Sequence, residues 1–347
     1  MKKTGLLVAG LLLIGVLAGC GSQAGAAQHL TLSTFGLSTK QMARDVTKPF
    51  TKKTKVTVKT QSGDSAARYT QVEHNPNNGV DVMELSQNNA LSGYKKGLWA
   101  KLDTSKLKNF KALSPAQQKL AKATNSVPYT VNSVGIIYNP AKVGKITSWD
   151  QLWDSKLKNK IAIPDITTTF GPAMLYIAGD HAGTAVTKDN GAAAFKAMAA
   201  LKPNVVKTYT QSSDLANMFK SGEIDAAVVG DFAVSMIQAA APSAVYVVPA
   251  SGTYANYDTV SIVKASKNKQ AAYQYIDYRL GKVAQTKVAS ADSLNNAPVN
   301  TDVTLSAADA KNKTYGDIAA RAKTIDFGYV NSHLKGWISQ WNKLMNK

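Results

Sequence analysis

Polar and aromatic side chains follow five predicted strands of this 347-residue chain, at the point where each strand ends. Their hydroxyls, carboxylates and rings are groups that bind a small molecule through hydrogen bonds, charge and ring contacts. In open α/β sheets, ligands bind in the crevice beyond the carboxyl ends of the strands. The residues that we single out there are Thr34, Phe35, Ser86, Asn88, Asp165, Thr167, Thr168, Asp231, Phe232, Tyr257 and Asp258.

No catalytic set stands out in the sequence. The four histidines have no HExxH or paired spacing, which argues against a zinc hydrolase. There is no GxSxG nucleophile elbow and no P-loop. Cys20 is the only cysteine, which excludes an internal disulfide and a cysteine-based metal cluster. We therefore expect a binding protein without cofactor or metal, and not an enzyme.

The stretch around residues 146–175 contains the most informative strand end. Ile161–Ile163 is a short apolar strand that Pro164 closes, because proline cannot donate to a sheet ladder. Asp165 to Thr169 then leads into a predicted helix from about Ala173. Hydroxyls and free backbone N–H groups are thus gathered where a strand gives way to a helix. Asp165 has an alternative role as a cap of that helix.

Strands and helices alternate along the chain. Leu30 and Leu32 alternate with polar residues in a first strand, and Met42, Val46 and Phe50 recur at helical spacing after it. Ser148 is a predicted N-cap of one or two helical turns over 149–153. The alternation predicts an α/β fold with mainly parallel sheets and flanking helices.

The length allows two lobes with separate cores, since about 320 residues follow the N-terminal segment. We predict that residues 29–135 form the first part of lobe 1, residues 136–247 form lobe 2, and residues 248–347 complete lobe 1 with C-terminal helices. The chain would cross between the lobes at Ser133–Tyr138 and again at Val245–Pro249. Two crossings make a hinge that allows closure around a ligand. Trp337 and Trp341 are expected in the core.

The N-terminus reads as an export signal. Two lysines precede an apolar run, Leu6 to Leu17, that is too short for a comfortable transmembrane helix. The ending Leu17-Ala18-Gly19-Cys20 resembles a lipobox, which implies a lipoprotein signal peptide over 1–19 and a diacylglyceryl group on Cys20. Residues 20–28 would be the lipidated cysteine and a flexible tether. The alternative is an ordinary secretory signal with a chance cysteine.

The formal net charge of +19 could suggest a nucleic-acid partner. The export signal argues against this class of partner, and the lysines are scattered over predicted surfaces and loops. We interpret the charge as a solvated surface beside an anionic membrane and cell wall. The charge therefore says nothing about the ligand.

Five stretches, in this order along the chain, resemble one family. They are Asn75–Val82, Val127–Asn139, the segment 146–175 with its "SWDQLWDSKLKNKIAIPD…GPA" pattern, Ser221–Ala226, and Val263–Tyr273. The chain resembles the type 2 extracellular solute-binding proteins of ABC importers, in the group that contains spermidine/putrescine-binding and ferric-iron-binding proteins. The resemblance implies a two-lobed periplasmic-binding-protein-like fold with a two-segment hinge. It also implies capture of a small solute and its delivery to the permease subunits of an ABC transporter.

The resemblance also suggests the type of ligand. Asp258 falls where polyamine-binding members place an aspartate for an ammonium group, with aromatic rings covering the methylenes. Asp231 falls where ferric-binding members place two adjacent tyrosines, and this chain has no Tyr-Tyr pair. A polyamine-like organic cation is therefore the leading expectation, and ferric iron is the least favoured one.

Two departures from the polyamine pattern leave the ligand open. Phe35 stands where that group tends to have Trp-Thr, and Thr167, Thr168 and Thr169 stand where it has a second acidic residue. Hydroxyls at a helix N-terminus suit an anionic group as well as a cation. Binding of 2-aminoethylphosphonate, thiamine or another zwitterionic or anionic solute is the alternative.

The expected location is the extracellular face of the cell membrane, or the periplasm if the source has an outer membrane. The expected partners are the solute, the permease and the lipid bilayer through the Cys20 anchor. We expect a monomer.

Overall fold

The computed structural model describes residues 28–345 of the chain. The expected signal peptide, Cys20 and nearly all of the tether lie outside the described residues. None of the described helices combines the length and the apolar character needed to cross a bilayer.

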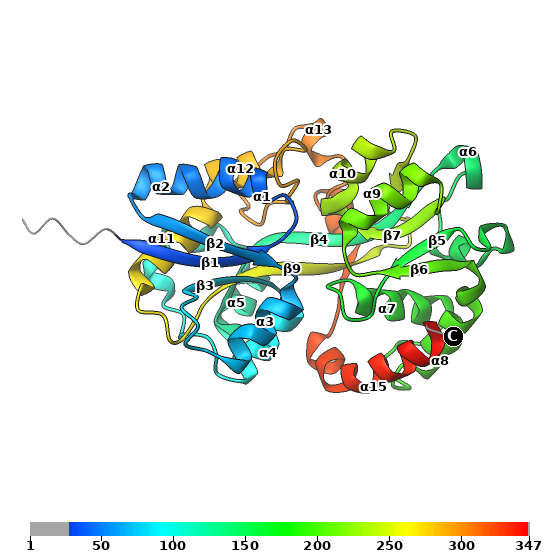
Figure 1. Cartoon of the computed structure of the whole chain (residues 1–347), viewed down its shortest axis with the longest axis horizontal. Helices are drawn as coiled ribbons and strands as arrows, with labels where there is room; N and C mark the ends of the chain where they lie inside the picture. Colours follow the sequence, from blue (N-terminus) through cyan, green and yellow to red (C-terminus); the bar gives the residue numbers. More distant parts are fainter. Residues whose placement is uncertain (1–27, 346–347) are drawn as a thin grey trace, which may run out of the picture.

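Two lobes lie side by side along the long axis of the molecule and share a ten-stranded sheet (Figure 1). The strands follow the order β2 (Thr57–Gly63), β1 (His29–Phe35), β3 (Val82–Ser86), β9 (Thr253–Ile262), β4 (Ser126–Tyr138), β7 (Ala226–Gly230), β5 (Ile161–Pro164) and β6 (Val205–Tyr209), with β10 (Ala322–Thr324) beside β9 and β8 (Val245–Val247) beside β4. β1 pairs in parallel with β2 and β3, and β5 pairs in parallel with β6 and β7. β9 pairs antiparallel with β3 and β4, and β4 pairs antiparallel with β7 and β8. The predicted fold class, α/β with two lobes, is confirmed.

Helices cover both faces of the sheet in the first lobe. One face carries α1 (Thr39–Met42), a π-helical turn (Ala43–Thr47), α2 (Lys48–Thr54), α11 (Lys269–Leu280) and α12 (Lys282–Ala289); the other carries α3 (Ser65–His74) and α4 (Gln87–Lys95), and α5 (Pro115–Thr124) contacts β4. Met42, Val46 and Phe50 are all buried in one cluster with Leu30 and Leu32. Their helical spacing therefore marks the buried face, as the sequence predicts.

The second lobe is layered in the same way. The helices α7 (Gly171–His181) and α8 (Ala192–Leu201) cover one face of its sheet, α9 (Ser212–Ser221) and α10 (Val234–Ala240) cover the other, and α6 (Pro140–Val143) follows β4. Ser148 forms a capping box with Gln151 and begins a 3₁₀ helix, Trp149–Trp153. Pro164 ends β5, as predicted. Short 3₁₀ turns also occur at Thr104–Lys106, Lys108–Ala112, Ser155–Leu157, Lys202–Asn204 and Asp231–Ala233.

The crossings between the lobes differ in part from the prediction. The first is β4, whose initial half pairs with β9 and whose final half, Val134–Tyr138, pairs with β7. The predicted return at Val245–Pro249 is wrong in position, because β8 stays beside the second-lobe half of β4. The return is made by β9, which begins after the turn at Gly252. A third connection, not predicted, passes through α13 (Ala307–Ala310) and α14 (Asp317–Ala320) to β10.

The sequence-based division assigned the C-terminal helix α15 (Phe327–Met345) to the first lobe, and in the structure this helix lies beside α8 of the second lobe (Figure 1). Asn331 of α15 also donates to the carbonyl of Asn88 and to Oγ of Ser92, in α4 of the first lobe. Trp337 and Trp341 are each only 1% exposed and pack in one cluster with residues of α7 and α8. The two tryptophans are core residues, as expected. The apolar face of α8 is their partner because both helices flank the same face of the second-lobe sheet.

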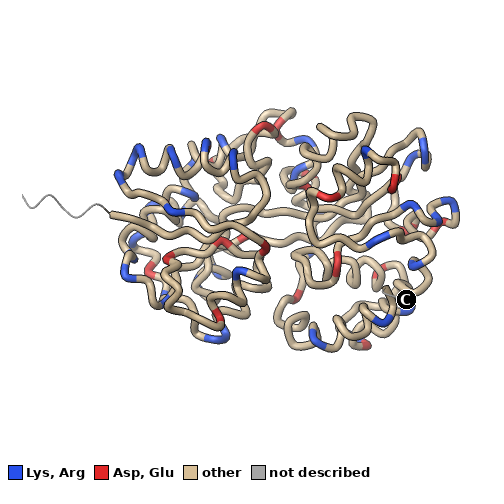
Figure 2. Tube along the Cα trace, viewed as in Figure 1, with Lys and Arg blue, Asp and Glu red and all other residues tan. Residues whose placement is uncertain are grey.

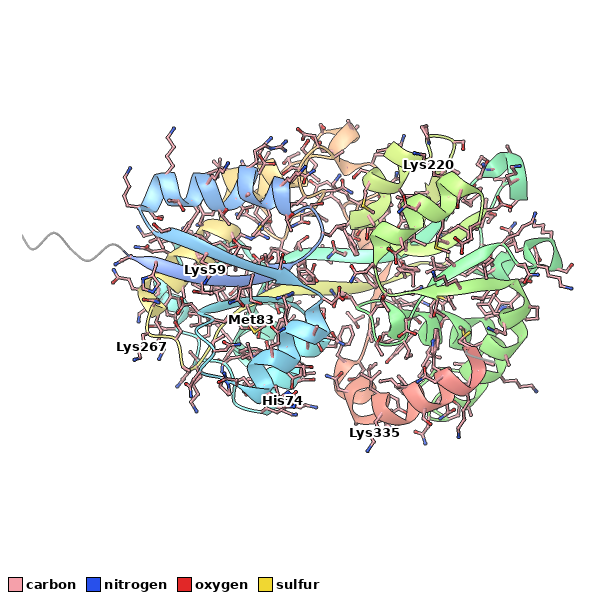
Figure 3. All side chains as sticks on the ribbon, in the orientation of Figure 1. Lys59, His74, Met83, Lys220, Lys267 and Lys335 are labelled. Atoms are coloured by element: carbon pink, nitrogen blue, oxygen red, sulfur yellow. The ribbon has the colours of Figure 1, made fainter. Side chains whose placement is uncertain are left out.

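Lysine and arginine residues occur along the chain in both lobes (Figure 2). The exposed Lys220, Lys267 and Lys335 lie on the outer surface, on α9, on the loop before α11 and on α15 (Figure 3). This distribution agrees with a solvated basic surface rather than one concentrated patch.

Candidate functional site

A cavity of about 350 Å³ lies between the lobes. The first lobe lines it with the loop after β1, the start of α3, and single residues of β3, β4, β9 and α11. The second lobe lines it with the β5–α7 loop and the β6–α9 loop. The cavity therefore lies beyond the carboxyl ends of β1, β2, β5 and β6, where parallel sheets bind ligands.

Six of the eleven residues singled out in the sequence line this cavity. They are Thr34, Phe35, Thr167, Thr168, Phe232 and Asp258. These residues come from both lobes, so the two lobes together form the site.

Four others have local structural partners and do not line the cavity. Ser86 donates to Oδ1 of Asn88 at 2.6 Å, at the start of α4. Asp165 accepts from the backbone nitrogen and hydroxyl of Thr167, so it closes its own turn. Tyr257 packs against the core of the first lobe.

Asp231 is also absent from the cavity wall. Its side chain is 2% exposed, and Oδ2 accepts from the backbone nitrogen and hydroxyl of Thr314 at 2.8 and 2.6 Å. Burial raises the pKa of Asp231 to about 7, although the bonds from Thr314 oppose this shift. The expectation that Asp231 and Asp258 face each other across the cleft is therefore wrong, because the third connection between the lobes covers Asp231.

Asp258 is a carboxylate in the cavity wall with neutral partners. Its Oδ2 accepts from Nδ2 of Asn132 at 2.9 Å, and its Oδ1 accepts from Nδ2 of Asn256 at 3.0 Å. Burial raises the pKa of Asp258 to about 7, against these two amide bonds, and the nearby Glu84 adds to the rise. A cationic group of a ligand would favour the ionised form of this carboxylate.

Glu84 and Arg279 form a buried ion pair at the floor that the sequence did not indicate. Both side chains are 1% exposed, and Nε of Arg279 donates to Oε1 of Glu84 at 2.9 Å. Oε2 of Glu84 accepts from the hydroxyl of Thr34 at 2.5 Å. Burial disfavours the charged guanidinium, but Glu84, Tyr275 and Tyr129 together outweigh burial, and the pKa of Arg279 is raised. A carboxylate inside the apolar strand 80–85 was the one sequence signal for this pair.

A second buried arginine lies close to the same floor. Arg68 donates from Nε to the carbonyl of Gly63 at 2.9 Å and from Nη1 to Oγ of Ser33 at 3.2 Å. Its guanidinium carbon is 5.0 Å from the ring centroid of Phe35, in a cation–π arrangement. Burial lowers the pKa of Arg68 to about 10, while nearby acidic groups oppose this shift. Arg68 and Arg279 are two of the only four arginines in the chain.

Two phenylalanines form an aromatic wall on the second lobe. The rings of Phe170 and Phe232 lie 6.2 Å apart with an interplanar angle of 16°. A Cβ at Gly230 would come within 2.5 Å of Phe232 and 2.7 Å of Phe170. Glycine at this position therefore allows both rings to close over the end of β7.

The two lobes touch at the rim of the cavity. Nε2 of Gln211, in the second lobe, donates to Oδ1 of Asp64, in the first lobe, at 2.6 Å. Both residues also line the cavity. The structure is thus one in which the lobes are joined across the site.

The chemistry of this lining is recognition through hydrogen bonds and charge. Within residues 28–345, no cluster of three or more histidine, cysteine or acidic residues is arranged to hold a metal ion. The lining provides a carboxylate, a guanidinium, hydroxyls and aromatic faces, which are the groups that orient a small ligand.

Comparison with known proteins agrees with this architecture. Residues 45–317 match the family model described as bacterial extracellular solute-binding protein. The spermidine/putrescine-binding periplasmic protein 1 of Haemophilus influenzae is 29% identical over 221 residues, 61% of this chain and 60% of that protein. The spermidine/putrescine-binding periplasmic protein of Salmonella typhimurium strain LT2 is 27% identical over 297 residues, 83% of each chain.

A solved structure gives a stronger match. The crystal structure of an ABC transporter from Clostridium perfringens ATCC 13124 is 47% identical, with a TM-score of 0.78, and covers 91% of this chain and 99% of that one. The chain therefore belongs to the bacterial extracellular solute-binding proteins. It is the solute-binding component of an ABC transporter, and members of this family are transport binding proteins rather than enzymes.

Proposed function

We propose that this protein captures a small amine-bearing solute between its lobes and delivers it, chemically unchanged, to a membrane permease. Asp258 carries the proposal. Its carboxylate lies in the cavity wall and has two amide donors as its side-chain partners, with no cationic partner among the described residues. An ammonium group is the ligand that such a carboxylate favours, because charge-assisted hydrogen bonds are stronger than neutral ones.

The aromatic side chains support the same proposal. Phe35, Tyr129, Phe170 and Phe232 line the cavity and provide apolar faces for a carbon chain. Polyamines are the first solutes to test, because the Haemophilus and Salmonella relatives are named for spermidine and putrescine. Thiamine and 2-aminoethylphosphonate also carry a cationic group and belong in the same test.

Isothermal titration calorimetry on the full-length protein in detergent tests this proposal. The panel contains putrescine, spermidine, thiamine and 2-aminoethylphosphonate, with the Asp258→Asn variant and with Asp317→Asn, an exposed aspartate outside the cavity, as the matched control. Losing a buried charged partner typically costs about 2–5 kcal/mol, so Asp258→Asn should weaken binding by about thirtyfold or more. Unchanged affinity in Asp258→Asn would refute the amine site.

We also propose that Cys20 is lipidated and holds the protein at the outer face of the membrane. The proposal is supported by the sequence Leu17-Ala18-Gly19-Cys20 after the apolar run. In Cys20→Ser cells, the protein should move from the membrane fraction to the medium or the periplasm. A variant that still fractionates with the membrane would contradict the anchor.

A further inference from the structure

Arg279 lines the cavity and has a buried donor without a partner among residues 28–345. A guanidinium has five N–H donors, and a buried donor without a partner is costly. Nε of Arg279 is bonded to Glu84, but Nη1 is enclosed and has no hydrogen-bond partner within the described part of the chain. Arg279 lines the cavity. An acidic group of a ligand would satisfy this donor.

Tyr129 contacts Arg279 through its ring and lies beside Asp258 in the paired strands β4 and β9. The pairing of β4 with β9 shifts between Pro128–Thr259 and Thr130–Asp258, so Tyr129 is the extra residue of a β-bulge beside Asp258. A β-bulge changes the direction in which a side chain points. Tyr129, at this bulge, lines the cavity. The guanidinium carbon of Arg279 lies 4.2 Å from the centroid of its ring. Both Glu84 and Asp258 add to the rise in the pKa of Tyr129, which burial dominates. The cation and the carboxylate thus flank one ring.

The second arginine increases the positive charge at the floor. Nη2 of Arg68 is also buried without a partner among residues 28–345, and Tyr129, Glu84, Asp258 and Asp64 are the groups that favour its charged form. Arg68 and Arg279 thus place two guanidinium groups close to Glu84 and Asp258. Asp64 lies at the exposed rim, where solvent screens its charge. A polyamine would add at least two positive charges beside these guanidinium groups, whereas a zwitterion would add no net charge.

Two threonines of the second lobe favour an amine of the ligand, rather than an acidic group, on the second-lobe side of the cavity. The hydroxyl of Thr167 donates to Oδ1 of Asp165 at 2.6 Å, and that of Thr168 donates to the carbonyl of Asp165 at 2.7 Å. Because each hydroxyl has one proton, both oxygens act as acceptors towards the cavity. Arg279 therefore offers an acidic group a charged donor that these two hydroxyls do not provide.

We propose that the solute is a zwitterion whose carboxylate or phosphonate binds the free donor of Arg279 while its amine binds Asp258, with its carbon chain over Tyr129. This inference rests on the proposed function, since it adds the acidic group to the amine-bearing solute. In this proposal, Arg279 is the residue that makes the protein select zwitterions over polyamines of similar length.

Calorimetry with chains of similar length tests the selection. Putrescine is compared with 4-aminobutanoate, 5-aminopentanoate and 2-aminoethylphosphonate on the full-length protein. At least one zwitterion should bind tenfold or more tightly than putrescine. Tighter binding of putrescine than of every zwitterion would overturn the inference and leave the amine site standing. Failure of all of them, and of spermidine and thiamine, would refute the proposed function itself.

Two variants separate ligand selection from structural support. Removing Arg279 alone leaves Glu84 buried without its partner, so the test uses the double variant Glu84→Gln/Arg279→Gln together with Arg279→Lys. The control is Arg44→Gln, a change to an exposed arginine of the same lobe. Both test variants should lose zwitterion affinity, the double variant by about thirtyfold or more, while putrescine affinity stays equal or rises. An equal loss for putrescine and zwitterions, in variants that circular dichroism shows to be folded, would mean that Arg279 only supports the fold.

Discussion

Thr314 donates both its backbone N–H and its hydroxyl to the buried carboxylate of Asp231. Thr314 lies on the third connection between the lobes, and Asp231 lies directly after β7 of the second lobe. The Thr314 hydroxyl is also 2.8 Å from Oγ of Ser133, in the crossing strand β4. Two segments that join the lobes, β4 and the third connection, thus meet beside this carboxylate of the second lobe. Asp231 is bonded to the connection between the lobes and does not line the cavity.

The first prediction concerns the pH dependence of stability. The folded pKa of Asp231 is about 7 and its ordinary value is 3.8, so the folded state keeps a proton that the unfolded state releases. The contribution of Asp231 to the free energy of unfolding is greatest below pH 3.8, falls as the pH rises to about 7, and is constant above pH 7. The Asp231→Asn variant has no carboxyl group at this position, so its free energy of unfolding does not fall for this reason as the pH rises. The difference in free energy of unfolding between variant and wild type should shift in favour of the variant by on the order of 4 kcal/mol between pH 4 and pH 8.

Urea denaturation at both pH values measures this difference. Other titrating groups cancel in the comparison, including Asp45, whose pKa is lowered by its bond to Arg44 and whose contribution has the opposite sign. The charge of the buried Lys313 opposes the rise in the pKa of Asp231. The pKa of Lys313 is itself lowered by burial, which is a further reason to compare the variant with the wild type at each pH. A stability difference that is the same at pH 4 and pH 8 would mean that Asp231 is ionised in the folded protein.

The second prediction concerns the pH dependence of solute binding. Asp258 must be ionised to bind an amine, and its pKa in the free protein is about 7. Affinity should therefore rise with pH, by up to about tenfold per pH unit below 7, and level off above it. Asp258→Asn should flatten the profile. Asp231→Asn is the control, because Asp231 titrates in the same range without lining the cavity. Its profile should retain the slope but lie at lower pH, because the charge of Asp231 adds to the rise in the pKa of Asp258.

The third prediction concerns the contact between the lobes at the rim. Gln211→Ala removes the bond from Gln211 to Asp64. Bonds between exposed groups contribute roughly 0.5–1 kcal/mol, so the affinity should fall about two- to fivefold. The loss should lie mainly in faster dissociation of the solute, measured by stopped-flow fluorescence. Gln238→Ala removes a bond within the second lobe and should leave dissociation unchanged.

The fourth prediction concerns the docking of α15. Trp337 is 1% exposed and donates from Nε1 to the carbonyl of Asn190 at 3.0 Å. Truncating a buried tryptophan costs about 3–5 kcal/mol, so Trp337→Ala should destabilise the second lobe. Hydrogen exchange should increase in α7 and α8. An increase confined to the first-lobe helices α3 and α4 would support the division in which this helix belongs to the first lobe.

Features that depend on neighbours in the sequence could be predicted from the sequence itself. The capping box of Ser148 and Gln151 is contained within four residues, and Pro164 ends β5 because its own nitrogen lacks a hydrogen. The buried face of Met42, Val46 and Phe50 follows from helical spacing. Thr34, Phe35, Thr167 and Thr168 line the cavity because a residue at a strand end lies at the ligand-binding edge of a parallel sheet.

Features that depend on distant partners were decided by the tertiary structure. Glu84 and Arg279 are separated by 195 positions, and only the packing of α11 beside β3 makes them a pair. Asp231 follows the end of β7, and a segment 83 residues away covers it and takes its carboxylate, whereas Asp258 lies inside β9 and lines the cavity. The sequence places each acidic side chain at an edge of the sheet. Whether that side chain meets solvent, a solute or another segment depends on where the rest of the chain packs, because burial and charge pairing are properties of the whole fold.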